Sequence, residues 1–495
     1  MSAVPGIETV LIANRGEIAV RIARTLRSLA IRSVVAHHRV DRNGPAVRAA
    51  DAGVEIHAAE PLAAYLDAEQ IAAAARRVGA DALHPGYGFL AENAAFAETV
   101  AKAGVRFIGP PPTVMRLMGD KIAARRFAAE RGFQVAPAVL EEDDPRGFLE
   151  GARRLGLPLL VKPSAGGGGK GIVRVSSPEE LEPALARARA EAARYFADAR
   201  LYVERFVERP RHVEVQILAD RHGTCLHLFE RECSVQRRFQ KLVEETPAPG
   251  LPDELRAALC REAVGIARAA RYEGAGTVEF VLSPSGEFFF LEMNTRLQVE
   301  HPVTELVTGL DLVAEQVRVA AGEPLRFGQQ DVRSSGCAIE CRICAEDADD
   351  GFLPTTGEVL LLREPAGPGV RFDAGLAEGR AVTADFDSLL AKLVVHGATR
   401  DEAIRRAREA LRETAILGVV TNQAFLARVL AHPAFARGEL HTGFLTEHAA
   451  DLAPRGLDDE HRLALVVAAA LAHPAFRERV LSVPEPQRWI GAWRN

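Results

Sequence analysis

The chain has 495 residues, of which 48% are hydrophobic and 26% charged, and its net charge is −6. That length allows roughly three domains with ample buried core, and the acidic balance argues against nucleic acid as the main partner. The longest clean apolar run ends at Ala472 and is too short for a membrane span, which needs ~20 residues. Six cysteines and no secretory signal at the N-terminus predict a reducing, cytoplasmic location.

The first part of the chain predicts a parallel α/β sheet. Buried strands are expected at 9–14, 32–38, 80–85 and 105–110. Between them lie helical stretches, the first with Ile18, Ile22 and Leu26 on one face, and others at 68–78 and 95–103. Strands that alternate with helices indicate a Rossmann-like domain, which we place at residues 1–118.

The rest of the chain predicts a mixture of strands and helices. A helix is expected at 118–132, strand-rich segments at 134–207, and an α+β block to about residue 321. A turn-rich and strand-rich region follows at 336–395, before a helix at 400–414. The expected fold is therefore a multidomain α/β and α+β protein.

A glycine-rich stretch, "KPSAGGGGKG", occupies residues 162–171. The usual P-loop has Ser or Thr after its lysine and joins a strand to a helix, whereas Gly171 stands in that place here. Short apolar strands flank the stretch on both sides, so it predicts the tip of a hairpin. Glycines let backbone N–H groups approach phosphate oxygens closely, which predicts a lid over a phosphate group.

A second hairpin, at residues 274–294, predicts the metal site. Taking Ser283 to Gly286 as the turn places Glu279 opposite Phe290, with Glu292 as its diagonal neighbour on the same face. Asn294 lies one same-face step further along. Two carboxylates and an amide oxygen in otherwise apolar strands predict a site for Mg²⁺ or Mn²⁺.

Lysine is scarce in this chain, with six lysines among the 61 Lys and Arg residues. Such a bias should preserve lysine where a compact ammonium cannot be replaced by a guanidinium. Lys102 and Lys392 are interpreted as a solvated helix residue and a structural ion pair. The other four lie in polar motifs that predict ligand contacts, namely Lys121, Lys162, Lys170 and Lys241.

Motifs along the chain together resemble the biotin carboxylase family of ATP-grasp ligases, over about residues 6–448. They are "IANRGEIAVRIART", "HPGYGFLAENAAFA", "FIGP", "MGDK", "AGGGGKG", "RHVEVQ", "ERECSVQRR", "QKLVEETPAP", "GAGTVEF", "EMNTRLQVEHPVTE", "ECRI" and "FLPTTG". The resemblance implies ATP- and bicarbonate-dependent carboxylation of biotin through carboxyphosphate, as a component of an acetyl-CoA or other acyl-CoA carboxylase. It also implies an ATP-grasp domain at 119–330 with its lid at about 136–207, a C-terminal carboxylase domain at 331–448, and a helical tail at 449–495.

The resemblance further implies a role for each matching residue. The ATP phosphates would contact Lys121, Lys162, Lys170 and the loop of Gly166, Gly167, Gly168 and Gly169. The adenine would lie against Glu204, Arg205, Phe206 and Val207, and the ribose near His212 and Gln236. Magnesium would bind Glu279, Glu292 and Asn294. Glu300 would be the base that deprotonates bicarbonate, which Lys241, Arg296, Gln298 and the Val299 amide would hold. Arg342 would stabilise the biotin ureido oxygen, with Tyr87 and Asp387 near the biotin.

The expected partners are a separate biotin carrier, a carboxyltransferase subunit and a second copy of the chain in a homodimer or larger complex. No lysine here follows a methionine, as a biotinylated lysine normally does. Trp489 and Trp493 lie in a tail that resembles the segment leading to the interaction domain of acyl-CoA carboxylase α-chains. Three departures from the family pattern, Ser28, Phe239 and Cys344, affect the dimer contact, the nucleotide contact and the surroundings of Arg342 respectively.

Two alternatives stay open at this point. Other ATP-grasp ligases, of the carboxylate–amine or carbamoyl-phosphate type, share the metal site and lid. More remotely, Cys337, Cys341 and Cys344 have the spacing by which radical S-adenosylmethionine enzymes hold an iron–sulfur cluster. Strand alternation opposes the cluster, because it points Cys344 away from the other two thiols.

Overall fold

The computed structural model describes residues 4–164, 171–196, 198–454, 456 and 459–472. It divides into two compact units, Met1–Leu452 and Ala453–Asn495. The predicted phosphate loop at 166–170, Trp489 and Trp493 lie outside the described residues.

The N-terminal sheet is parallel, as predicted, with strand order β3-β2-β1-β4-β5. Its strands are β1 (Thr9–Ile12), β2 (Arg32–His37), β3 (Ala52–Glu55), β4 (Ala82–His84) and β5 (Arg106–Phe107). Their helices are α1 (Gly16–Ser28), α2 (Pro45–Ala49), α3 (Pro61–Tyr65), α4 (Ala68–Arg77) and α5 (Ala94–Lys102). Because β1 and β4 are neighbours, their carboxyl ends meet, and the Asn14 amide donates to the carbonyls of Pro85 and Tyr87 at 2.7 and 2.8 Å. This contact fixes the loop that contains Tyr87.

The largest sheet is antiparallel and has the order β14-β13-β10-β11-β12-β15-β22-β20. Its strands are β10 (Arg211–Ala219), β11 (Cys225–Arg237), β12 (Gln240–Thr246), β13 (Gly274–Leu282), β14 (Phe288–Asn294), β15 (Cys337–Cys344), β20 (Val370–Ala374) and β22 (Leu389–Gly397). The sequence predicted the middle and C-terminal strands as separate regions, whereas the β12–β15 pairing joins them into one sheet. Polar residues far apart in the chain therefore share one surface.

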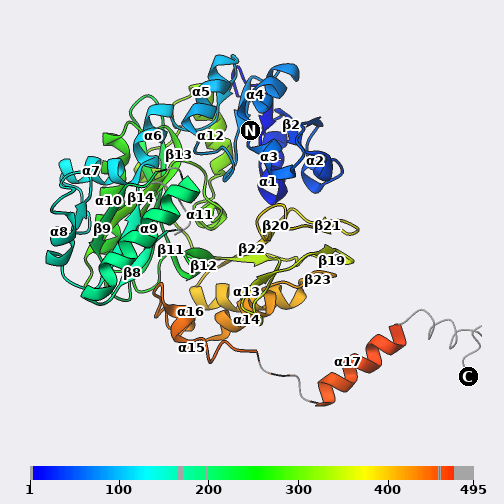
Figure 1. Ribbon diagram of the computed structural model, residues 1–495. Helices are drawn as coiled ribbons and strands as arrows, with labels where there is room; N and C mark the ends of the chain where they lie inside the picture. Colours follow the sequence, from blue (N-terminus) through cyan, green and yellow to red (C-terminus); the bar gives the residue numbers. More distant parts are fainter. Residues whose placement is uncertain (1–3, 165–170, 197, 455, 457–458, 473–495) are drawn as a thin grey trace, which may run out of the picture. The chain divides into compact units, whose positions relative to one another are not determined.

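Helices cover both faces of this sheet near β15 and β22. Helix α11 (His301–Thr308) packs on one face through Val303 and Val307. Helix α13 (Arg400–Glu413) packs on the other, in a core with Ile339 and Cys341 (Figure 1). Further helices of this unit are α6 (Pro112–Gly119), α7 (Lys121–Glu130), α10 (Asp253–Ala269), α12 (Leu312–Ala321) and α14 (Gln423–Ala431).

A four-stranded sheet, β6-β9-β7-β8, occupies the segment predicted to be the lid. Its strands are β6 (Ala138–Leu140), β7 (Leu159–Pro163), β8 (Val173–Val175) and β9 (Leu201–Arg205). Strands β7 and β8 are antiparallel neighbours, so the glycine-rich stretch joins two strands as predicted. The prediction of strand-rich segments at 134–207 missed α8 (Phe148–Arg154) and α9 (Leu181–Phe196). A signal for α9 was present, because it is rich in Ala, Arg and Glu, which favour helix.

Short elements complete the C-terminal part. Three two-stranded pairs are β16 (Glu346–Asp347) with β17 (Leu353–Pro354), β18 (Gly357–Glu358) with β21 (Ala381–Val382), and β19 (Leu361–Arg363) with β23 (Ala415–Leu417). Helices α15 (Pro433–Ala436) and α16 (Phe444–Glu447) end the first unit, and α17 (Asp459–Ala472) belongs to the second. Within the described ranges, every helix is too short or too polar to cross a membrane.

Candidate active site

Glu279 and Glu292 face each other directly across the β13–β14 hairpin, so the predicted diagonal register is wrong. The turn is one residue longer than expected: the Gly286 N–H donates to the Ser283 carbonyl at 3.1 Å, and the Ser283 N–H to the Glu287 carbonyl at 2.7 Å. Gly286 takes φ = +88°, which glycine adopts without a steric penalty. A bulge between Glu279 and Phe280 then shifts the pairing again. The two changes keep both carboxylates on one face.

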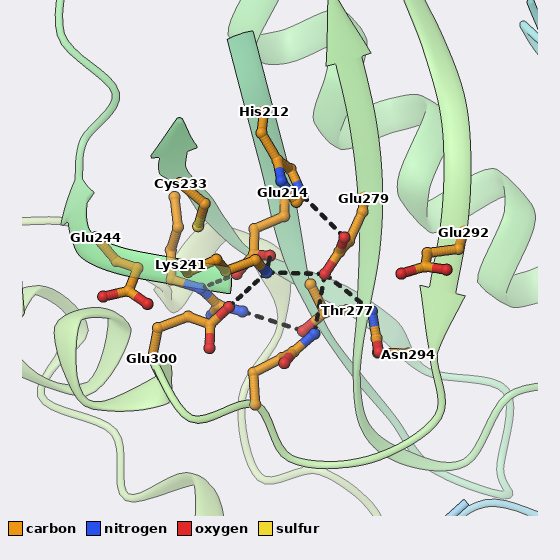
Figure 2. Close-up of polar contacts among 12 residues, drawn as sticks. His212, Glu214, Cys233, Lys241, Glu244, Thr277, Glu279, Glu292, Asn294 and Glu300 are labelled. Atoms are coloured by element: carbon orange, nitrogen blue, oxygen red, sulfur yellow. Dashed lines mark hydrogen bonds and ion pairs between the residues drawn. The ribbon is translucent and has the colours of Figure 1, made fainter. Parts of the chain in front are cut away.

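Glu279 accepts hydrogen bonds from four side chains (Figure 2). Its donors are His212 Nε2 at 2.8 Å, Lys241 Nζ at 2.8 Å, Asn294 Nδ2 at 2.9 Å and Gln298 Nε2 at 3.1 Å. Burial alone would raise the pKa of Glu279, but Lys241 and His212 outweigh it and hold the pKa well below its ordinary value. Glu279 is therefore a buried anion that attracts cations.

The hairpin face fits a divalent cation. Glu292 accepts from Lys121 Nζ at 2.7 Å, so each carboxylate of the facing pair already binds an ammonium group. The Asn294 amide oxygen lies beside them and accepts from Arg296 at 3.1 Å. Two carboxylates and an amide oxygen are hard oxygen ligands of the kind that Mg²⁺ prefers.

Lys241 joins three buried carboxylates. Its Nζ lies 2.5 Å from Glu214, 2.8 Å from Glu279 and 2.6 Å from Glu300 (Figure 2). Although burial lowers the pKa of Lys241, the three anions raise it well above its ordinary value. The ammonium stays charged, which suits a group that binds an anion.

Glu300 lies between two cations at the N-terminus of α11. One oxygen accepts from Lys241 at 2.6 Å and the other from Arg342 Nη2 at 2.9 Å. Arg342 also donates through Nε to Glu244 at 2.5 Å. Burial would raise the pKa of Glu300, but Lys241 and Arg342 hold it well below its ordinary value. Burial raises the pKa of Glu244 to about 7 although Arg342 opposes this shift.

Arg296 is held by several hydrogen-bond acceptors beside this cluster. Its guanidinium donates to Glu92 at 2.8 Å, to Gln298 at 2.9 Å and to Asn294 at 3.1 Å. The structure thus brings together the predicted catalytic residues Lys241, Arg296, Glu300 and Arg342 with Gln298. The carbonyl of the neighbouring Val299 accepts from Lys392 Nζ at 2.8 Å.

Among the described residues, the predicted nucleotide contacts other than Lys121 lie on or next to the lid sheet and on strands β10 and β11. Lys162 forms a buried ion pair with Glu204. Arg125 Nη1 lies 3.8 Å from the other oxygen of the same carboxylate. Beyond Glu204, the guanidinium of Arg205 lies 5.6 Å from the Phe289 ring, Phe206 packs under Arg174, and Val207 follows, half-buried. Gln236 Nε2 lies 3.4 Å from His212 Nδ1.

Tyr87 and Asp387, the predicted biotin neighbours, lie close enough in space to interact although they are 300 residues apart in the chain. The Tyr87 hydroxyl donates to Glu17, which also lies 3.2 Å from Lys392 Nζ. Burial raises the pKa of Tyr87 well above its ordinary value, with Glu17 adding to the shift and the field of Arg342 opposing it. Asp387 accepts from the Leu389 N–H at 3.1 Å and is near enough to influence Tyr87. The interpretation of Lys392 as a structural ion pair is confirmed, and Lys102 is exposed on α5 as predicted.

Comparison with known proteins identifies the fold and the family. Residues 6–115 match the model for "Biotin carboxylase, N-terminal domain", and residues 340–447 match "Biotin carboxylase C-terminal domain". Residues 120–327 match "Carbamoyl-phosphate synthase L chain, ATP binding domain". The chain is 47% identical to the biotin carboxylase of Nostoc sp. over 442 residues, which is 89% of this chain and 99% of that protein. The chain belongs to the biotin carboxylase family.

Two further relatives support this assignment, one a curated sequence and the other a solved structure. The α subunit of Dictyostelium discoideum methylcrotonoyl-CoA carboxylase is 42% identical over 99% of this chain and 70% of that protein. The biotin carboxylase domain dimer of Hydrogenobacter thermophilus 2-oxoglutarate carboxylase, solved with magnesium ADP and bicarbonate, superposes with a TM-score of 0.88. It is 40% identical and covers 91% of this chain and 99% of its own. The chain is therefore an ATP-dependent ligase.

The carbamoyl-phosphate alternative shares only the middle domain, since both flanking domains match biotin carboxylase. The iron–sulfur alternative fails on geometry. Cys337 and Cys341 contact the core beneath α13, whereas Cys344 is absent from that cluster. All six cysteines are unpaired.

Sequence reasoning missed four residues that organise the site, namely Glu92, Glu214, Arg231 and Glu244. Arg231 is fully buried and binds Glu214 at 2.6 Å, Gln216 at 2.6 Å and Thr304 at 3.0 Å. A signal was present, because polar residues alternate with valine in "RHVEVQ" and so share one face of β10. Their charge partners come from other strands, which the sequence did not place.

Proposed function

We propose that this chain carboxylates biotin on a carrier, using ATP and bicarbonate. ATP phosphorylates bicarbonate to carboxyphosphate with release of ADP, and the carboxyl group then passes to the biotin ureido group with release of phosphate. The observation that supports these steps most is the position of Glu300 between Lys241 and Arg342.

Glu300 is the proposed proton acceptor. Its depressed pKa keeps it ionised through the neutral range, so one oxygen is ready to take the bicarbonate proton. Lys241 and Arg296, with the Gln298 amide and the Val299 N–H, would hold the bicarbonate oxygens. Arg342 would donate to the ureido oxygen as negative charge develops there, and Tyr87 and Asp387 would border the biotin. Fixed donors aimed at developing charge are usually the largest catalytic contribution.

Glu279, Glu292 and Asn294 would hold Mg²⁺ or Mn²⁺, which supplies charge neutralisation for the ATP phosphates. Lys121 and Lys162 would release their carboxylates, Glu292 and Glu204, to bind those phosphates, together with the loop from Gly166 to Lys170. The backbone at Glu204 to Val207 would contact the adenine, with His212 and Gln236 at the ribose. Phosphoryl transfer needs mainly this positioning and neutralisation.

We also propose the domain division 1–118, 119–330 and 331–448, with a tail from residue 449. The biotin would belong to a separate carrier, and a carboxyltransferase would consume the carboxybiotin. Within the described residues, no lysine follows a methionine. The dimer named for the Hydrogenobacter relative supports a homodimer, and six unpaired cysteines support a reducing cytoplasm.

The test supplies labelled bicarbonate, magnesium ATP, ammonium ion and a biotinylated carrier domain to the purified full chain. Label should appear on the carrier, and a streptavidin blot of the chain itself should be blank. A biotin signal on the chain, or label transfer to ammonia-derived products in place of the carrier, would contradict the proposal.

A further inference from the structure

Glu340 is a carboxyl group behind the proposed site for which the mechanism gives no role. It lies on β15 two residues before Arg342, so both side chains share one face of the sheet. Its register partners are Glu244 on β12 and Val394 on β22. Glu340 is fully buried, and within the described part of the chain neither of its oxygens has a hydrogen-bond partner.

The surroundings of Glu340 disfavour a charge there. On one side lie Ala338, Val394 and Val303 of an apolar cluster beneath α11. An ionised carboxylate that is buried without donors is costly, so the group becomes neutral instead. Burial raises the pKa of Glu340 well above its ordinary value.

The charged groups that face Glu340 come from every element around it. Lys392 on β22 and Arg342 on β15 favour ionisation, whereas Glu244 on β12 and Glu300 at the start of α11 oppose it. Lys392, the cation that favours ionisation most, is already bound to Glu17 at 3.2 Å and to the Val299 carbonyl at 2.8 Å. Next to Glu300, the buried His301 has a pKa held well below its ordinary value by burial and by Lys392, so it adds no positive charge.

We propose that Glu340 is a neutral carboxylic acid and that its lack of charge positions Arg342. With Glu340 uncharged, the Arg342 guanidinium pairs with two carboxylates only, those of Glu244 and Glu300. This inference rests on the role proposed for Arg342. The two contacts, at 2.5 and 2.9 Å, use Nε and Nη2 and set the direction of the guanidinium. An ionised Glu340 would add a third anion beside Arg342, repel both partners and draw the guanidinium away from Glu300.

The test compares wild type with Glu340→Gln, which keeps the shape of the side chain and cannot ionise. At pH 7.5 the kcat for biotin carboxylation should stay within about threefold of wild type, and the KM for ATP should be unchanged. As the pH rises, wild type should lose kcat/KM for biotin when Glu340 ionises, and in E340Q this loss should begin at least one pH unit higher. Ile339→Val is the matched control, because it perturbs the same strand on the opposite face and should keep the wild-type pH profile.

An infrared spectrum gives a readout that does not need activity. The difference spectrum between wild type and E340Q at pH 7.5 should contain the C=O stretch of one protonated carboxylic acid, and the difference spectrum between wild type and I339V should lack it. A hundredfold loss of kcat in E340Q, an unchanged alkaline limb, or identical spectra would overturn the proposal. If wild type carboxylates no biotin, the function proposed above fails, while the infrared comparison still decides whether Glu340 is neutral.

Discussion

Replacing Glu244 by glutamine should change how the stability of the protein depends on pH. Burial raises the pKa of this carboxyl from its ordinary 4.5 to about 7. The folded state therefore holds this proton more tightly than the unfolded chain does. The resulting stabilisation is fully present below pH 4.5 and is lost as the pH rises through 7. At 1.36 kcal/mol per pH unit, the whole window is worth roughly 3 kcal/mol, and most of it, about 2–3 kcal/mol, falls between pH 5 and pH 8.

The thermal midpoint of the first unit, Met1–Leu452, gives the assay. An unfolding entropy of ~2.1 cal/mol/K per residue converts about 2–3 kcal/mol into a midpoint shift of about 2–3 °C. Loss of the Arg342 contact lowers the E244Q midpoint by itself, so the quantity to follow is the difference between the two proteins as the pH changes. From pH 5 to pH 8 the E244Q midpoint should gain about 2–3 °C relative to wild type, whereas the exposed control Glu413→Gln should gain none. A midpoint difference between E244Q and wild type that stays constant with pH, or a relative gain by wild type, would refute the conclusion that burial raises the pKa of Glu244.

Two further substitutions test the cation and phosphate sites. Glu292→Gln should raise the Mg²⁺ concentration needed for half-maximal ATP cleavage at least tenfold, because one of the two facing carboxylates is lost. The control Glu287→Gln, at an exposed position of the same hairpin, should leave this concentration unchanged. Equal Mg²⁺ requirements in E292Q and wild type would count against the hairpin site. Lys121→Met should weaken ATP binding by about 10- to 100-fold in a calorimetric titration, as expected for the loss of a charged hydrogen bond. Its control is Lys102→Met, at an exposed position, which should bind ATP as wild type does. Unchanged ATP affinity in K121M would show that Lys121 does not bind the phosphates.

Local patterns predicted the elements well. The parallel N-terminal sheet follows from apolar runs such as Val10 to Ile12, which are buried on both faces because helices cover the sheet. The metal hairpin was found because Glu279 and Glu292 interrupt apolar strands. The register of this hairpin was not predicted correctly. It depends on a three-residue turn ending at Gly286 and on a bulge at Glu279, and the alternating pattern does not encode these backbone conformations.

Long-range pairings account for what the sequence did not predict. Glu244 and Glu340 face each other only because β12 pairs with β15, which joins two regions of the chain in one sheet. Arg231 lies among Glu214, Gln216 and Thr304 because β10, β11 and α11 meet there. The family resemblance supplied the roles of single residues, whereas the charge balance among Lys241, Arg342 and their carboxylates required the structure.

Bicarbonate-dependent ATP cleavage with free biotin, measured side by side for wild type and Glu300→Gln, tests the central claim most directly. Wild type should cleave ATP only when bicarbonate is present and faster when biotin is added. E300Q should bind ATP with an affinity within about threefold of wild type and lose ~10²–10⁴-fold of the rate, because the amide cannot take the bicarbonate proton. Cleavage by wild type that ignores bicarbonate, or more than half of the wild-type rate in E300Q, would contradict the assignment of Glu300 as the base of a biotin carboxylase.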